Sequence, residues 1–171
     1  MRLRDAWRLA RLVAANLREP PKQKLRLDVG CGFNKQPGFV GMDRRKVKGV
    51  DIIHDAEDLP WPLPSESCAV VLMSHLIEHI VPGKTIDVMD ECWRLLEPGG
   101  LLMMTTPYAT SFGYFMDPTH CNPWNEATPT YFDPENPSGL YNIYKPKPWK
   151  IVKHFWSQVG NMELVMEKRD A

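Results

Sequence analysis

Short apolar runs recur at regular intervals through the first two thirds of the chain, and each run ends at a turn signal. The runs are Leu25–Val29, Phe39–Asp43, Asp51–His54, Ala69–Met73 and Leu101–Thr105. Runs of this length indicate buried strands. One longer segment between the last two runs repeats apolar residues at helical spacing, namely Ile86, Met89, Cys92, Trp93 and Leu96. Strands that alternate with a helix predict an α/β fold with a parallel sheet.

The 171 residues suit one domain, residues 1–171, because domains of this size are common. Helical spacing over residues 3–18 predicts an N-terminal helix within 1–20, and Pro20 ends it. The sheet core follows at 25–106. Two strand-like runs separated by Gly160-Asn161 predict a C-terminal hairpin over 150–168.

Residues 107–149 differ in composition from the rest of the chain. They hold eight of the sixteen prolines and all five tyrosines. Prolines at this density exclude long helices and central strands, while the aromatic content argues against disorder. We therefore expect an ordered loop region, on the side of any active site where an acceptor substrate would bind. Seven of its aromatic side chains either line a substrate site or fill the loop core. They are Tyr108, Phe112, Tyr114, Phe115, Trp124, Tyr131 and Phe132.

The overall composition narrows the class of partners. Charged residues make up 25% of the chain and the formal net charge is zero, so no nucleic-acid partner is indicated. The four cysteines form no closely spaced pair, which argues against a zinc ribbon or a disulfide framework. Together these features predict a cytoplasmic protein of unknown oligomeric state. The arginine-bearing helix leaves membrane-surface contact through residues 1–18 open as an alternative.

Three polar features follow three of the predicted strands. The first strand runs into Gly30-Cys31-Gly32, where missing side chains let a ligand approach the backbone amides. Asp43 ends the second strand, where a carboxylate can accept hydrogen bonds from both hydroxyls of a ribose. Asp55 follows the third strand and can accept from the exocyclic amine of adenine. Carboxyl ends of parallel strands meet at one edge, so a nucleoside site is expected there.

The order of these motifs resembles class I S-adenosylmethionine-dependent methyltransferases, in the small-molecule (type 11/12-like) branch. The resemblance covers about residues 25–107. The motifs are Leu27–Gly32, Asp43, Asp55–Pro60, Ala69–Ser74 followed by Leu76–His79, and Arg94–Leu101. The resemblance implies a Rossmann-like three-layer αβα fold, with a mostly parallel seven-stranded sheet and an antiparallel C-terminal hairpin. The links after strands 1 and 2 are short, so we expect shortened helices or single turns there.

The resemblance also implies S-adenosyl-L-methionine as the cofactor and suggests which residues hold it. Asp28, Gly30, Cys31 and Gly32 would cradle the methionine end. Asp43 would hold the ribose, and Asp55 with Ala56 would hold the adenine. The backbone around Ser74 would hold the amino group.

The methyl acceptor is expected to be a small molecule, and His75, His79 and His120 are the candidate catalytic residues, as bases or orienting groups. No metal is expected. A metal site made of His75, Glu78, His79 and His120 stays open as an alternative, because His75 and His79 would lie one turn apart on a helix. Two other functions also stay open. One is a non-catalytic S-adenosylmethionine-binding subunit, and the other is a metal-dependent hydrolase that uses the HxxEH motif at 75–79.

Overall fold

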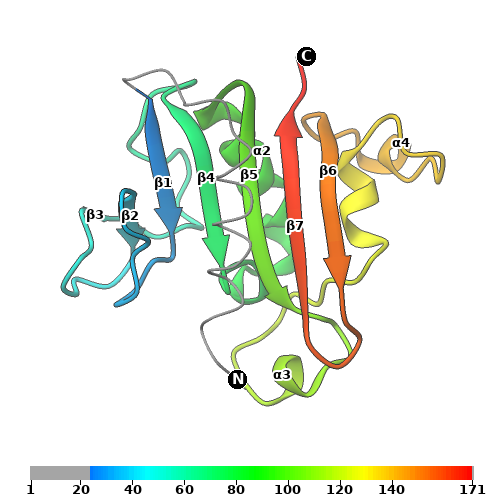
Figure 1. The fold of residues 1–171 in the computed structure, drawn as a ribbon, viewed down its shortest axis with the longest axis horizontal. Helices are drawn as coiled ribbons and strands as arrows, with labels where there is room; N and C mark the ends of the chain where they lie inside the picture. The colour runs from blue at the N-terminus through cyan, green and yellow to red at the C-terminus, as the bar shows by residue number, and fades with distance from the viewer. Residues whose placement is uncertain (1–23, 171) are drawn as a thin grey trace.

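The computed structural model describes residues 24–170, and the expected helix within 1–20 lies outside the described residues. Seven strands form one sheet (Figure 1). They are β1 (Leu25–Val29), β2 (Val40–Asp43), β3 (Ile52–Ile53), β4 (Cys68–Ser74), β5 (Leu96–Pro107), β6 (Trp149–Trp156) and β7 (Asn161–Lys168). All seven predicted runs are therefore strands, with ends that shift by a few residues.

The strand order is β3-β2-β1-β4-β5-β7-β6. Strands β1 to β5 pair in parallel, whereas β7 runs antiparallel to both β5 and β6. The mostly parallel sheet with an antiparallel C-terminal hairpin is thus confirmed. The chain leaves β1 toward β2 and β3 and then returns to form β4 on the other side of β1. This reversal is the topological switch point, beside which open α/β sheets bind ligands.

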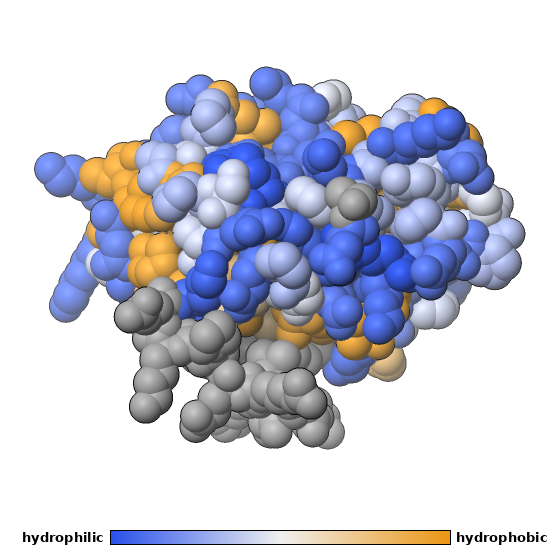
Figure 2. Space-filling view, turned by 90° about the horizontal axis from the view of Figure 1, so that it is seen from above, coloured by the Kyte–Doolittle hydropathy of each residue, from blue (hydrophilic) through white to orange (hydrophobic). Residues whose placement is uncertain are grey.

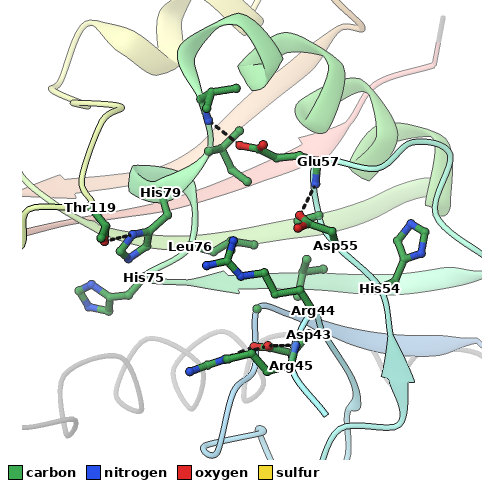
Figure 3. Close-up of a pocket in the computed structure, with 15 residues that line it drawn as sticks. Asp43, Arg44, Arg45, His54, Asp55, Glu57, His75, Leu76, His79 and Thr119 are labelled. Carbon is green, nitrogen blue, oxygen red and sulfur yellow. Dashed lines mark hydrogen bonds and ion pairs between the residues drawn. The ribbon is translucent and has the colours of Figure 1, made fainter. Parts of the chain in front are cut away.

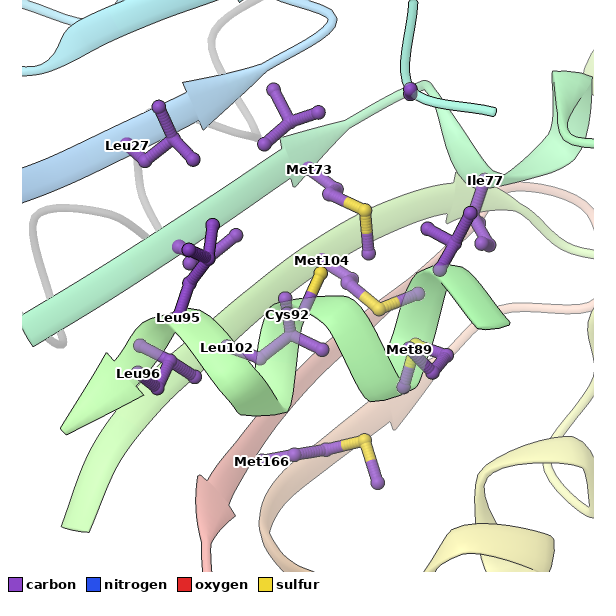
Figure 4. Close-up of a cluster of buried hydrophobic side chains, with 14 of the residues drawn as sticks. Leu27, Met73, Ile77, Met89, Cys92, Leu95, Leu96, Leu102, Met104 and Met166 are labelled. Atoms are coloured by element: carbon purple, nitrogen blue, oxygen red, sulfur yellow. The ribbon is translucent and has the colours of Figure 1, made fainter. Parts of the chain in front are cut away.

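Helix α2 (Thr85–Leu95) lies against one face of the sheet (Figure 1). Its side chains Met89, Cys92 and Leu95 repeat at helical spacing, and they pack against alternate residues of the strands, such as Met104 and Met166 (Figure 4). The residues between these alternate positions, including Val70 and Met103, form a second buried cluster. The apolar runs are continuous because the centre of the sheet is buried on both faces.

The connections are shorter than the full helices that link parallel strands in many α/β proteins. Residues 30–39 and 44–51 contain turns and no helix, so the shortened helices expected after strands 1 and 2 are single turns. Within residues 24–170, α2 is the one α-helix longer than four residues. The long helix of the described part of the chain therefore covers one face of the sheet.

The proline-rich segment 107–149 has no long element, as its composition predicts. It contains α3 (Phe112–Phe115), the 3-10 helix η3 (Thr128–Phe132) and α4 (Tyr141–Tyr144). Two further 3-10 helices, η1 (Ile77–His79) and η2 (Pro82–Lys84), precede α2. The carboxyl ends of β1, β4 and β5 point toward α3 in Figure 1, and the opposite end of the molecule is covered mainly by hydrophilic residues (Figure 2).

Candidate functional site

A crevice with a volume of about 470 Å³ lies at the carboxyl ends of the parallel strands. It lies at the switch point, because Gly30 follows β1 and His75 follows β4. Figure 3 shows the residues that line it. They are Val29, Gly30, Asp43, Arg44, Arg45, His54, Asp55, Ala56, Glu57, His75, Leu76, His79, Ile80, Val81 and Thr119. The volume lies within the usual range for small-molecule sites.

Gly30 lines the crevice at a position where the backbone conformation and the neighbouring Leu76 favour glycine. Its φ of +71° is a left-handed conformation, and a Cβ atom at this position would lie 2.8 Å from Cδ1 of Leu76. The side chain of Leu76 therefore packs directly on the backbone of Gly30, in the space that a side chain at position 30 would take. The bare backbone that the sequence predicts at this position allows this packing.

The backbone amides of the glycine turn all have hydrogen-bond partners within the protein. Gly30 and Cys31 donate their N–H groups to the carbonyl of Met42, at 2.7 Å and 3.2 Å. Gly32 donates its N–H to Oδ2 of Asp43 at 2.8 Å. Residues of the neighbouring strand β2 therefore accept from all three amides of the turn. The turn fixes the carboxylate of Asp43.

Asp43 is buried at the end of β2 and accepts hydrogen bonds on both carboxylate oxygens. Arg45 donates to Oδ1 from its backbone N–H at 2.8 Å and from Nε at 3.1 Å. Burial acts to raise the pKa of Asp43, but the hydrogen bonds from Arg45 and Gly32 outweigh it and lower the pKa below its ordinary value. The group therefore stays ionised, as a carboxylate that accepts from sugar hydroxyls must be.

Asp28 and Cys31 are buried and are not among the residues that line the crevice. Burial raises the pKa of Asp28 to about 6, although its carboxylate accepts from the backbone N–H of Gln36 at 2.7 Å. Burial likewise raises the pKa of the Cys31 thiol to about 11. The Cys31 side chain packs against Gly41, where an added Cβ would lie 2.7 Å from Sγ. The Cys31 thiol therefore stays protonated near neutral pH and packs against β2.

The two residues expected at an adenine ring, Asp55 and Ala56, both line the crevice. Asp55 accepts from the backbone N–H of Glu57 at 3.0 Å, and Glu57 accepts from the backbone N–H of Val81 at 2.7 Å. This chain of bonds ties the loop after β3 to the loop after β4 (Figure 3). Ser74 does not line the crevice, and its hydroxyl lies 3.1 Å from that of Thr105.

The HxxEH segment is not a continuous helix, so the expectation that His75 and His79 lie one turn apart on a helix was wrong. His75 has a φ of +55°, and a 3-10 helix begins only at Ile77. The Nδ1 atom of His75 lies 3.0 Å from Oε1 of Glu78. Both His75 and His79 line the crevice, whereas His120 does not.

His120 nevertheless lies beside His79, with ring centroids 4.7 Å apart. The segment that carries it is held to η1, because Cys121 and Asn122 donate their N–H groups to the carbonyl of Glu78, at 2.9 Å and 3.1 Å. One ligand atom from each of Glu78, His79 and His120 lies within 4.8 Å of the others. The structure thus brings together three of the four residues of the metal alternative and leaves His75 outside the group.

None of the seven candidate aromatic residues of segment 107–149 lines this crevice. Tyr108, Tyr114, Trp124 and Phe132 are buried, and Trp124 stacks on Phe132 with ring centroids 6.0 Å apart. For these four, the structure supports the reading that they fill the loop core. Phe112 and Phe115 of α3 are exposed.

Sequence reasoning missed Arg44, Arg45 and Thr119, which all line the crevice. The two arginines directly follow Asp43, so their place at a strand tip was available as a signal. Thr119 directly precedes His120 and accepts or donates a hydrogen bond at Nδ1 of His79, at 3.0 Å. Its role depends on contact between segments forty residues apart, which no local pattern shows.

The fold and the crevice define a Rossmann-like protein with a crevice of small-molecule size at its switch point. Residues 31–104 match the sequence model of a family described as a methyltransferase domain. The resemblance to class I S-adenosylmethionine-dependent methyltransferases is therefore confirmed, and S-adenosyl-L-methionine is the cofactor that this class implies.

Three known proteins illustrate the similarity. A probable S-adenosylmethionine-dependent methyltransferase of Mycolicibacterium smegmatis is 29% identical over 115 residues, which span 58% of this chain and 44% of that protein. The tRNA N(3)-cytidine methyltransferase METTL2 of Gallus gallus is 28% identical over 106 residues, which span 46% of this chain and 29% of that protein. The chain thus matches less than half of either relative's length.

Among solved structures, a SAM-dependent methyltransferase from Archaeoglobus fulgidus superposes with a TM-score of 0.66. The sequence identity is 17%, and the match covers 95% of this chain and 92% of the other. At this identity the likeness establishes the fold.

Proposed function

We propose that this chain binds S-adenosyl-L-methionine in the crevice and transfers its methyl group to a small-molecule acceptor. The observation that carries the proposal is the position of Asp43. Its ionised carboxylate lies at the tip of β2, beside the switch point and across from the close approach of Gly30 and Leu76. A ribose in the crevice would present its two hydroxyls to this carboxylate.

The other lining residues fit the same ligand. Asp55 offers a carboxylate to the exocyclic amine of an adenine, and Ala56 offers a small apolar surface to the ring. The cofactor, when bound, supplies an activated methyl group on a sulfonium. What the protein must add is alignment of the acceptor, since orientation alone contributes much of the rate of such transfers. His75 and His79 both line the crevice. In this proposal His75 accepts a proton from an acceptor that arrives protonated, and His79 helps to orient the acceptor.

A small-molecule acceptor agrees with the zero net charge, because extended nucleic acids are normally bound by a basic face. The likeness to a tRNA-modifying enzyme concerns under a third of that protein, so tRNA enters the test as a competing acceptor. We also propose a cytoplasmic location, since the described cysteines are all free thiols. Among the described residues, no helix has the length and apolar character needed to cross a bilayer.

The test combines binding and turnover. Calorimetric titration with S-adenosylhomocysteine should give one site of micromolar affinity. Formation of S-adenosylhomocysteine from the cofactor should then depend on an acceptor within a panel that contains phenols, carboxylic acids, amines and unmodified tRNA. Binding with no turnover on any acceptor would favour the non-catalytic subunit. No binding at millimolar S-adenosylhomocysteine would contradict the proposal.

A further inference from the structure

The group Glu78, His79 and His120 has the properties of a metal site as well as the spacing. Its candidate ligand atoms lie within 4.8 Å of one another at the rim of the crevice. Two imidazoles and one carboxylate form a donor set that binds zinc and similar divalent transition metals. The spacing alone would not support a metal site, because clusters of these residue types also occur without a bound ion.

The buried carboxylate of Glu78 supplies an independent observation. The residue is 0% exposed, and Oε1 is the oxygen that faces His75. Oε2 is buried and has no hydrogen-bond partner. A buried carboxylate oxygen without a partner is costly, and it is normally satisfied by a proton donor or a cation. This atom belongs to the same residue that completes the group with the two histidines.

The two histidines are oriented as metal ligands are. Nδ1 of His120 lies 2.8 Å from the carbonyl oxygen of Tyr114, which can only accept, so Nδ1 carries the proton. Nδ1 of His79 lies 3.0 Å from the hydroxyl of Thr119, and that hydroxyl donates to Asp117 at 2.7 Å. Because the Thr119 hydroxyl donates its hydrogen bond to Asp117, it accepts a hydrogen bond from the Nδ1–H group of His79. In both rings the unprotonated nitrogen is therefore Nε2.

Donation of the other ring nitrogen to a carbonyl or to a carboxylate-linked group is the usual outer-shell arrangement of a metal-binding histidine. The site is also rigid, because the amides of Cys121 and Asn122 bind the carbonyl of Glu78. The side chain of Asn122 further binds the carbonyl of Ile77 at 3.0 Å. Oδ2 of Asp117 lies 3.9 Å from Nε2 of His120, the nitrogen that would bind the ion.

We propose that Glu78, His79 and His120 bind one divalent transition-metal ion of the zinc type, with coordination positions left open toward the crevice. His79 and Thr119 line the crevice, so these positions face the space that an acceptor would enter. The ligand set excludes His75, which lies outside the group and whose Nδ1 instead lies 3.0 Å from Oε1 of Glu78.

The experiment uses the full chain without a histidine tag, stripped with a chelator and titrated with zinc chloride and, separately, with cobalt chloride. We expect one equivalent to bind at micromolar affinity or tighter, with visible cobalt absorption of a four- or five-coordinate site. His79→Ala, His120→Ala and Glu78→Gln should each weaken binding by at least a hundredfold. Thr119→Val should weaken it by about tenfold to a hundredfold, the usual effect of an outer-shell change.

His54→Ala is the matched control, because His54 also lines the crevice but lies outside the group. It should leave metal affinity unchanged, and circular dichroism should show every variant folded. Absence of binding below 100 μM in the wild type would overturn the proposal, as would equal affinity in the Glu78→Gln, His120→Ala and wild-type proteins. The readout is the metal alone, so failure here leaves the proposed cofactor binding untouched, and the reverse also holds.

Discussion

The guanidinium of Arg45 lies on the carboxylate of Asp43, with Nε 3.1 Å from Oδ1 and Nη2 3.4 Å from Oδ2. Its Nη2 also lies 2.7 Å from where a Cβ of Gly32 would be. Arg45 thus occupies the polar edge at which a ribose would bind. A sugar that reaches Asp43 must displace the guanidinium, while the backbone bonds from Arg45 and Gly32 keep the carboxylate in place.

Removal of the Arg45 side chain, which would compete with a ribose for Asp43, should tighten cofactor binding. The side chain of Arg45 is 55% exposed, and ion pairs of this kind contribute at most about 1 kcal/mol. Arg45→Ala should therefore bind S-adenosylhomocysteine about two- to fivefold more tightly than wild type, as measured by calorimetry. Weaker binding in this variant would mean that Arg45 contacts the ligand directly.

Gly30 should tolerate no side chain. Gly30→Ala meets Leu76 at 2.8 Å and keeps a left-handed φ, whereas Gly38→Ala has a φ of +80° with open space around it. Gly38→Ala therefore measures backbone strain alone. We expect Gly30→Ala to lower the free energy of unfolding by about 1–3 kcal/mol more than Gly38→Ala, the usual cost of overpacking. Urea unfolding of both variants checks this, and equal losses would show that the Leu76 contact is unimportant.

Asp28 should make stability depend on pH. Its pKa is about 6 in the folded protein and about 3.8 ordinarily, so between these pH values the folded state holds a proton that the unfolded state has lost. Stability from this group is therefore present below pH 4 and falls as pH rises through 6. Asp28→Asn removes the titration, so its advantage over wild type should grow by about 2–3 kcal/mol between pH 4 and pH 7.

Urea unfolding at several pH values measures this difference. Asp58→Asn, at an exposed acid, is the control. An advantage of Asp28→Asn that stays constant with pH would show that Asp28 is not forced to ionise in a buried site.

The sequence patterns predicted most of the sheet because strands and one amphipathic helix are encoded locally. Leu25–Val29 matches β1 at both ends. The start of β5 was missed because Leu96 pairs with Cys68 before an irregularity and regular pairing resumes at Leu101. A proline and two glycines in this stretch look like a turn in isolation. Only the neighbouring strand makes them part of a ladder.

The site was predicted less completely, because its properties come from contacts between distant segments. Gly30, Asp43 and Asp55 were found from their places after strands, and all line the crevice. Strand register decides that residues of β2 accept from the glycine-turn amides. Loop packing decides that the rings of His79 and His120 lie in contact. Residue spacing carries no information on either.

The most direct test of the central claim is a crystal structure of the protein with S-adenosylhomocysteine. We predict that the two ribose hydroxyls lie within hydrogen-bond distance of the Asp43 carboxylate, with the Arg45 guanidinium moved away and the adenine beside Asp55. A ligand bound elsewhere, or a crevice still closed by Arg45 at saturating ligand, would contradict the account.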